Sequence, residues 1–224
     1  MQISRRTLIG STVLLPILAL PGCAAGTGFS LVDAIRRLLS LSAQRAFASL
    51  LVENGFLDSQ VARIEVPAAL GGGTATNILS AILTSGVFRQ RLVRQVNRAA
   101  ERGAEIAAPM VAQAIQSLSV NDALSVVRGG SSAATDLLKG QMGTALLTAM
   151  VPGIGDALKL FDSAVVTEAL KSATGIDFAG LRDDVTQKAS NGIYRAIARE
   201  EAAIRADPQS TNDALLIGVF GLLK

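Results

Sequence analysis

Apolar residues recur at intervals of three and four along most of this chain, with polar residues between them. This period is typical of amphipathic helices that turn one face to a core. The segments for which we expect helices are 31–50, 87–106, 109–118, a stretch beginning at 133, and 177–205. Ser30 is placed to cap the first helix, and Asp207-Pro208 ends the last long one. The pattern therefore predicts an all-α fold, a single multi-helix bundle.

Two prolines mark boundaries in this pattern. Residues 62–67 read ARIEVP, alternate between apolar and polar side chains and end in a proline, so we expect a short extended connector there. Pro109 is expected to begin a helix of its own, because proline suits the first helical turn.

Two apolar segments raise the question of membrane contact. Residues 140–155 read GQMGTALLTAMVPGIG and carry no charge. A membrane span needs about 20 apolar residues, so we expect a fully buried core helix here instead. The last segment, 213–223, ends in LLIGVFGLL and is expected either to pack on the bundle or to touch a bilayer.

The first 22 residues have the order of an export signal. Arg5 and Arg6 precede an uncharged apolar run that ends in a small residue just before Cys23. Two prolines interrupt the run, and it is too short for a permanent span, so we expect a signal peptide over residues 1–22. The sequence SRRTLI around the arginines resembles the twin-arginine export motif.

Cys23 is the only cysteine of the chain. It ends the sequence LPGC, which resembles the lipobox of bacterial lipoproteins, where the cysteine carries diacylglycerol and becomes the first residue after cleavage. We expect lipidation at Cys23, a tether over residues 23–29 and an all-helical domain over residues 30–224. The alternatives are a cysteine in an ordinary cleaved signal, or a small buried apolar residue. The resemblance implies an exported protein anchored on the periplasmic side of the cell envelope, and Ala24 is typical of outer-membrane delivery.

Charge and aromatic content argue against one class of function. Removal of residues 1–22 takes away two basic residues and no acid, so 19 of the 21 basic residues remain against 18 acids. Nucleic-acid binding calls for a basic excess and aromatic side chains that stack on bases. This chain has one tyrosine and no tryptophan. We therefore expect no nucleic-acid partner.

The segment 87–106 has the most regular charge pattern of the chain. The arginines on one face of its helical wheel are Arg91, Arg94, Arg98 and Arg102. Glu101 and Glu105 share that face, so ordinary surface ion pairs of Arg98 with Glu101 and of Arg102 with Glu105 explain the pattern. The alternative is an anion-binding site, because guanidinium groups suit phosphate and carboxylate, and lipid headgroups are the phosphates nearest to an anchored protein.

The side chains that commonly carry catalysis are scarce. The chain has no histidine, no GxSxG motif and no thiol other than Cys23, so we expect no metal, no cofactor and no enzymatic activity. Asp183-Asp184 and Glu200-Glu201 are adjacent acids on one expected helix, where neighbours point about 100° apart and do not share a site. A hydrolase with two carboxylates from distant segments stays open.

Several short motifs share their order and spacing with a known family. They include Asn97-Arg98-Ala99-Ala100-Glu101, Gly129-Gly130, Ala133-Ala134-Thr135, Gly192-Ile193-Tyr194, Ile197-Ala198-Arg199-Glu200-Glu201, Ile204-Arg205 and Val219-Phe220-Gly221. In these motifs the chain resembles domain of unknown function 4197, from about residue 57 to residue 223. The resemblance implies an exported bacterial protein, often a lipoprotein, and it implies no activity, catalytic residue or cofactor.

These observations favour a lipid-anchored envelope domain that binds without catalysis. The membrane is the expected partner through the lipid anchor, and the ligand is expected to be apolar or phospholipid-like and held between the helices, or else a partner protein. A structural envelope protein without a small-molecule ligand is the alternative, and a carboxylate-dependent hydrolase is a third.

Overall fold

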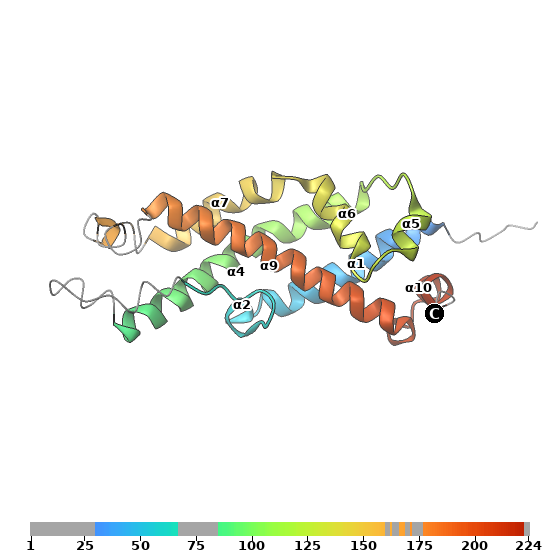
Figure 1. Ribbon diagram of the computed structural model, residues 1–224, viewed down its shortest axis with the longest axis horizontal. Coiled ribbons are helices and arrows are strands. Elements are labelled where there is room, and N and C mark those ends of the chain that lie inside the picture. Colours follow the sequence, from blue (N-terminus) through green and yellow to red (C-terminus); the bar gives the residue numbers. More distant parts are fainter. Residues whose placement is uncertain are drawn as a thin grey trace, which may run out of the picture.

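The computed structural model describes residues 30–66, 85–159, 162, 166–168, 171 and 177–221. Four long helices form an elongated bundle: α1 (Leu31–Leu50), α4 (Gly86–Gln116), α7 (Ala145–Leu158) and α9 (Phe178–Ala206) (Figure 1). The shorter ones are α2 (Gly55–Asp58), α5 (Ala123–Arg128), α6 (Ala133–Met142), the 3-10 helix η3 (Pro208–Thr211) and α10 (Ala214–Phe220). No strand occurs in the described residues, and the all-α prediction is confirmed.

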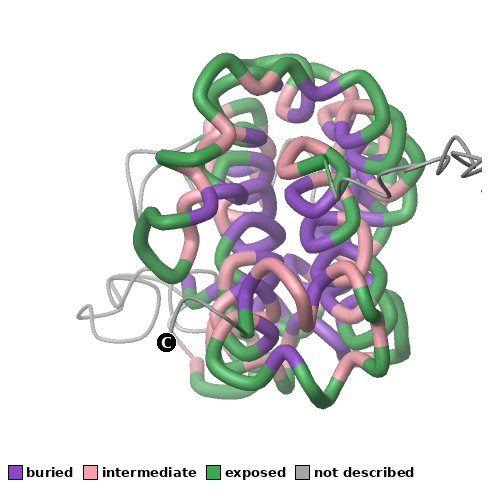
Figure 2. The backbone as a smooth tube through the Cα atoms, turned by 90° about the vertical axis from the view of Figure 1, so that its right-hand side faces the viewer, coloured by how far each residue is buried: buried purple, intermediate pink, exposed green. Residues whose placement is uncertain are grey.

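The core lies along the axis of the bundle. Its most extensive contacts are those of α4 with α7 and of α1 with α9. Seen from one end, the buried positions of the long helices face one another, and the exposed positions face outward (Figure 2). Fully buried side chains in this core include Ile35, Leu38, Val96, Leu146, Met150, Ile193 and Ile197. The apolar periodicity of the sequence thus forms the interior, as expected from its helical spacing.

Helix α4 runs through Pro109, so the prediction that this proline begins a new helix is wrong. Pro109 is exposed, and the chain on both sides of it keeps one buried stripe that includes Ala107, Val111 and Ile115. A proline inside a helix removes one backbone hydrogen bond, and Pro109 lies on the solvent side, where the freed carbonyl is open to water. The packing of the stripe against α7 outweighs that loss.

The uncharged segment 140–155 is not one fully buried helix. It breaks at Gly143, whose φ of +52° suits glycine, and continues as α7. In α7, Leu146, Met150 and Ile154 face the core, whereas Pro152 is exposed. Within the described residues, no helix is both long and apolar enough to cross a membrane.

Glycines bring α4 and α7 close together. A Cβ atom on Gly103 would lie 2.9 Å from atoms of Met150 and Ile154, and one on Gly153 would lie 2.6 Å from Ile106 Cδ1. Real Cβ contacts are longer, so a side chain at Gly103 would displace the buried ends of Met150 and Ile154, whereas one at Gly153 would displace only the end of the exposed Ile106 side chain. Core side chains of α7 therefore fill the space beside Gly103.

The extended connector is held by one buried amide. Ala62, Ile64 and Val66 are buried, with exposed residues between them, so the predicted alternation is confirmed for residues 62–66, and residue 67 lies outside the described part. Asn97 of α4 accepts a hydrogen bond from the Ile64 N–H and donates one to the Ile64 carbonyl, both at 2.9 Å. The Asn97 side chain thus pairs with both backbone groups of Ile64, as a neighbouring strand would in a sheet. These buried backbone groups are therefore satisfied.

The start of α1, the end of α4 and the C-terminal helix lie at one end of the bundle. Arg36 donates a hydrogen bond to the Leu118 carbonyl just after α4 (3.0 Å), and Arg37 pairs with Asp213 at 2.6 Å before α10. Burial alone would raise the pKa of Asp213, but the hydrogen bonds from Arg37 and from the first amides of α10 lower it below its ordinary value. The last segment therefore packs on the bundle at the end where the chain enters α1.

Candidate functional site

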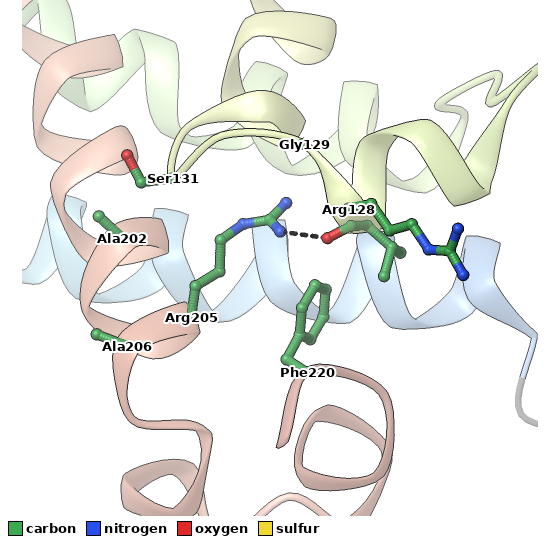
Figure 3. A pocket seen from close by; sticks show the side chains of 8 residues that line it. Arg128, Gly129, Ser131, Ala202, Arg205, Ala206 and Phe220 are labelled. Carbon is green, nitrogen blue, oxygen red and sulfur yellow. Dashed lines mark hydrogen bonds between the residues drawn. The ribbon is translucent and has the colours of Figure 1, made fainter. Parts of the chain in front are cut away.

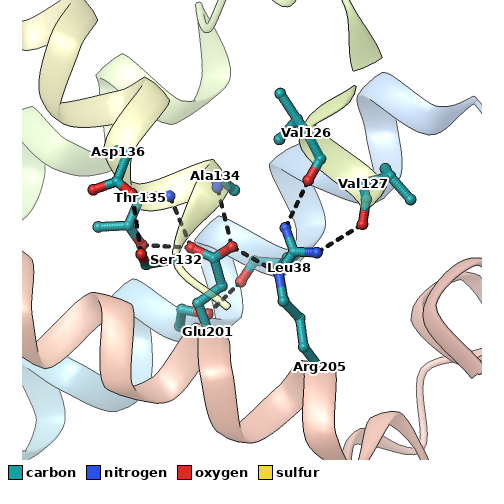
Figure 4. A network of polar contacts seen from close by, with 10 residues as sticks. Leu38, Val126, Val127, Ser132, Ala134, Thr135, Asp136, Glu201 and Arg205 are labelled. Carbon is teal, nitrogen blue, oxygen red and sulfur yellow. Dashed lines mark hydrogen bonds and ion pairs between the residues drawn. The ribbon is translucent and has the colours of Figure 1, made fainter. Parts of the chain in front are cut away.

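A fully buried carboxylate holds helix α6 against helix α9. Glu201 of α9 accepts hydrogen bonds from the N–H groups of Ala134 (3.0 Å) and Thr135 (2.8 Å) and from the Thr135 hydroxyl (2.6 Å) (Figure 4). These amides belong to the first turn of α6. The N–H groups of a first turn have no hydrogen-bond acceptor within their own helix. The carboxylate therefore caps α6 from a distance of more than 60 residues in the sequence, with favourable charge at the positive end of the helix.

The charge of Glu201 is matched by Arg205, one turn further along α9. The Arg205 Nε atom donates to Glu201 at 2.8 Å, and the two Nη atoms donate to the carbonyls of Val127 (2.8 Å) and Val126 (3.0 Å) at the end of α5 (Figure 4). Its guanidinium also lies over the Phe220 ring of α10, 4.9 Å from the ring centre. One ion pair on α9 thus fixes α5, α6 and α10 at the same time.

A pocket of about 540 Å³ opens beside this ion pair, and we refer to it as the end pocket (Figure 3). Its lining residues are Val127, Arg128, Gly129, Ser131, Ala202, Arg205, Ala206 and Phe220. The walls from α9 and α10 are apolar, while Arg205 points into the space between them (Figure 3). Arg128 and Ser131 are exposed at the rim and make no ion pair or hydrogen bond in the described part of the chain. The pocket therefore combines an apolar wall with basic and hydroxyl groups.

A second hollow, the basic groove, lies near the start of α4, and its volume is about 570 Å³. Its lining residues are Leu57, Asp58, Arg63, Glu65, Gly86, Arg89, Gln90, Val93 and Arg94. Three separate parts of the chain thus form it: α2, the extended connector and the first turns of α4. In the described residues, no group of three or more acids, cysteines or histidines is placed to hold a metal ion.

With this geometry established, comparison with known proteins gives one result. The family described as "Protein of unknown function (DUF4197)" matches residues 27–221. The chain belongs to this family. Neither a curated protein nor a solved structure matches it.

Several of the motifs that carry the resemblance to DUF4197 lie around the end pocket, whereas Asn97-Arg98-Ala99-Ala100-Glu101 and Gly192-Ile193-Tyr194 lie elsewhere in the bundle. Gly129-Gly130 and Ala133-Ala134-Thr135 form the turn into α6, and Glu200-Glu201 and Ile204-Arg205 lie opposite on α9. Phe220 of the last motif closes the pocket from α10. These separate stretches therefore meet in one place, which their spacing along the chain did not indicate.

The four arginines predicted as an anion site lie on exposed positions of α4, but they do not form one cluster. Arg102 pairs with Glu105 at 2.8 Å, as expected from the sequence, whereas Arg98 lies 3.8 Å from Glu53 at the end of α1. Arg94 lines the basic groove, and Arg91 makes no ion pair or hydrogen bond in the described residues. The structure thus brings Arg94 together with Arg63 and Arg89, which the sequence pattern had not singled out.

The expected ion pair of Arg98 with Glu101 does not form within the described residues, and Glu101 lies against the backbone of Phe56 in α2. One of its carboxylate oxygens is buried without a hydrogen bond among the described residues. Burial raises the pKa of Glu101 above its ordinary value, and the backbone N–H of Phe56 and the Arg98 guanidinium oppose this rise. Glu101 does not line either hollow. The predicted export and lipidation residues Arg5, Arg6 and Cys23 lie outside the described residues.

Proposed function

We propose that this DUF4197 protein is an exported, lipid-anchored envelope protein that binds a small amphipathic anion, without catalysis, in the end pocket. The observation that carries the proposal is an apolar wall beside an exposed guanidinium, that of Arg128, which makes no ion pair or side-chain hydrogen bond within the described residues. Arg205 is held by Glu201 and by two backbone carbonyls, so the wall beside it needs no reordering when a ligand arrives. Pockets of 300–1,000 Å³ are typical of small-molecule sites, and the end pocket falls in this range.

The lining indicates how such a ligand would lie. Its apolar body would pack on Phe220, Ala202 and Ala206, and its acidic group would face Arg128, which lies on the other side of Arg205 from Ser131 (Figure 3). Arg128 has its full donor set available, and a guanidinium binds carboxylate or phosphate through two parallel hydrogen bonds. A single-chain lipid, such as a fatty acid, combines these two features.

Proximity to a membrane supports this class of ligand. If Cys23 carries the lipid, the seven residues from there to Ser30 span at most about 25 Å. Ser30 precedes α1, whose first turns contact the end of α4 and the α10 cap beside the end pocket. The pocket would therefore open within reach of the bilayer from which a single-chain lipid leaves.

The two alternatives from the sequence have less support. The close packing of α4 on α7 at Gly103 and Gly153 favours a structural protein without a ligand. The end pocket is formed by other elements, so this packing does not fill it. A hydrolase would require two carboxylates in one cleft, with the pKa of one of them raised. Asp58 and Glu65 share the basic groove, whereas the acid with the raised pKa, Glu101, lies outside it.

Native mass spectrometry of the full chain, purified from a bacterial envelope in a nonionic detergent, tests the proposal. We expect a bound molecule with the mass of a single-chain lipid. Ala202→Phe should abolish this adduct, because the ring fills the pocket without removing a hydrogen bond. Thr148→Phe, on the exposed face of α7, serves as the matched control and should keep the adduct. A protein without any adduct, or an adduct that survives in Ala202→Phe, would overturn the proposal.

A further inference from the structure

The first half of α4 carries a concentration of positive charge next to the basic groove. Between residues 86 and 100 the helix has four arginines and no acid. Arg89 and Arg94 both line the groove. At 100° per residue, about 140° of the helix surface separates them, and Gly86, Gln90 and Val93 lie on the arc between. The two guanidiniums therefore stand on opposite flanks of one groove, with small or neutral side chains between them.

The acids near the groove do not neutralise these arginines. Glu65 is held by Arg63 at 2.6 Å across the extended connector, and Arg63 also donates to the Leu57 carbonyl. The side chains of Arg89 and Arg94 make no ion pair or hydrogen bond within the described residues. Asp58 is the remaining acid of the lining, so the groove keeps an excess of positive charge.

We propose that the basic groove binds a phosphate group, clamped between Arg89 and Arg94 and contacted by Arg63. A guanidinium is planar and donates two parallel hydrogen bonds that match two oxygens of a phosphate, so flanking arginines suit this ligand better than lysines would. Gly86 leaves room at the floor, because a Cβ atom there would meet no atom of the described residues within 4 Å. This site is separate from the end pocket and does not depend on the function proposed for that pocket.

The position of the groove bears on the source of the phosphate. Helix α4 has 31 residues and is about 46 Å long. Its end lies beside the start of α1, through the hydrogen bond from Arg36 to Leu118, so the groove lies toward the far end of the bundle from the expected anchor. A water-soluble phosphate compound or the headgroup of a phospholipid can each supply the group, and the two sources can be separated by competition.

Binding of radiolabelled inorganic phosphate to the full chain, in a maltoside detergent that contains no phosphate, tests the site. We expect saturable binding that weakens at least tenfold in the double variant Arg89→Gln, Arg94→Gln. The matched control is Arg45→Gln, Arg199→Gln, which removes the same charge outside the groove and should change binding less than twofold. Equal thermal midpoints for the two double variants would show that both are folded.

Two competitors distinguish the sources of the phosphate. Displacement of the label by glycerol phosphate supports a soluble ligand, and displacement by a short-chain phosphatidylglycerol supports a lipid headgroup; either result supports a phosphate site. Absence of saturable binding would overturn the proposal. An equal loss of affinity in both double variants would also overturn it, because the net charge of the protein would then explain the binding.

Discussion

Glu201 has no contact with solvent, and each N–H or O–H group that donates a hydrogen bond to it has no other acceptor within the described residues. Glu201→Gln would place an amide –NH2 against N–H donors and leave the Arg205 charge unpaired at a site that is 11 % exposed. Loss of one partner of a buried ion pair is strongly destabilising, so we expect the free energy of unfolding to fall by roughly 3 kcal/mol. Denaturant unfolding followed by circular dichroism measures this change.

The adjacent Glu200 offers a matched control, because it carries the same side chain on the same helix and makes no ion pair or hydrogen bond in the described residues. Glu200→Gln should change the free energy of unfolding by less than about 0.5 kcal/mol. Similar effects of the two variants would contradict the role assigned to Glu201.

Tyr194 is the single tyrosine of the chain, so its ionisation can be followed directly by absorbance. Burial raises its pKa to about 12, because the charged phenolate is poorly solvated beside Met142. The folded state therefore binds the phenol proton more tightly than the unfolded state, in which the pKa is about 10. The stability that this difference contributes is complete below pH 10 and is lost as the pH rises from about 10 to about 12. A spectrophotometric titration should give a midpoint near 12 in the folded protein and near 10 in denaturant. A midpoint near 10 in both would contradict the burial of this ring.

The burial of Glu201 could have been predicted from its position on the helix, whereas the sequence pattern was interpreted only for the adjacent pair Glu200-Glu201. Residues at steps of four along the last long helix, Ala189, Ile193 and Ile197, are all buried, and Glu201 is the next in this row. An acid that continues an apolar row is expected to be buried and to need a partner. Its partners on α6 lie 66 and 67 residues away, and no local spacing rule identifies them.

At the scale of elements, glycines fix where segments cross. A Cβ atom on Gly192 of α9 would lie 3.1 Å from the Cα and carbonyl oxygen of Ala62, and these backbone atoms have little freedom to move. Gly192→Ala should therefore lower the free energy of unfolding by about 1–2 kcal/mol, even though alanine favours a helix, because overpacking typically costs about 1–3 kcal/mol. Thermal or denaturant unfolding measures the effect.

Gly140 of α6 is the control for this substitution, because a Cβ atom there would meet no atom within 4 Å in the part of the chain that the structure describes. Gly140→Ala should raise the free energy of unfolding by about 0.5–1 kcal/mol, through helix propensity alone. A stabilising Gly192→Ala would show that the connector does not pack on α9 as described.

The helices themselves were largely predictable, and their boundaries were less so. Ser30 caps α1, and Asp207-Pro208 follows α9, because capping and proline chemistry act over a few neighbouring residues. The prediction of a helix start at Pro109 was wrong, because the packing of buried α4 residues against α7 decides whether the helix continues. That packing depends on a partner more than 30 residues away.

At the scale of the molecule, the candidate sites depend on which segments meet. The basic groove joins α2, the connector and α4, and the end pocket joins α5, the turn into α6, α9 and α10. The periodicity of α4 predicted the exposed row of Arg91, Arg94, Arg98 and Arg102, but it could not show that Arg89 and Arg63 complete a groove with Arg94. Arg98 likewise pairs with Glu53, just after α1, and only the packing reveals this contact.

The proposed anchor gives the whole molecule an orientation, and Cys23 tests it. Thioether lipidation needs the sulfur atom, so Cys23→Ser in the full chain should abolish incorporation of labelled palmitate and leave the signal uncleaved. Ala24→Ser is the control, since it keeps the thiol beside an equally small residue, and labelling should persist. Gel fluorography after expression in a bacterium measures both. A free, alkylatable thiol at Cys23 in the exported protein would contradict the anchor, and with it the argument that the end pocket opens toward the membrane.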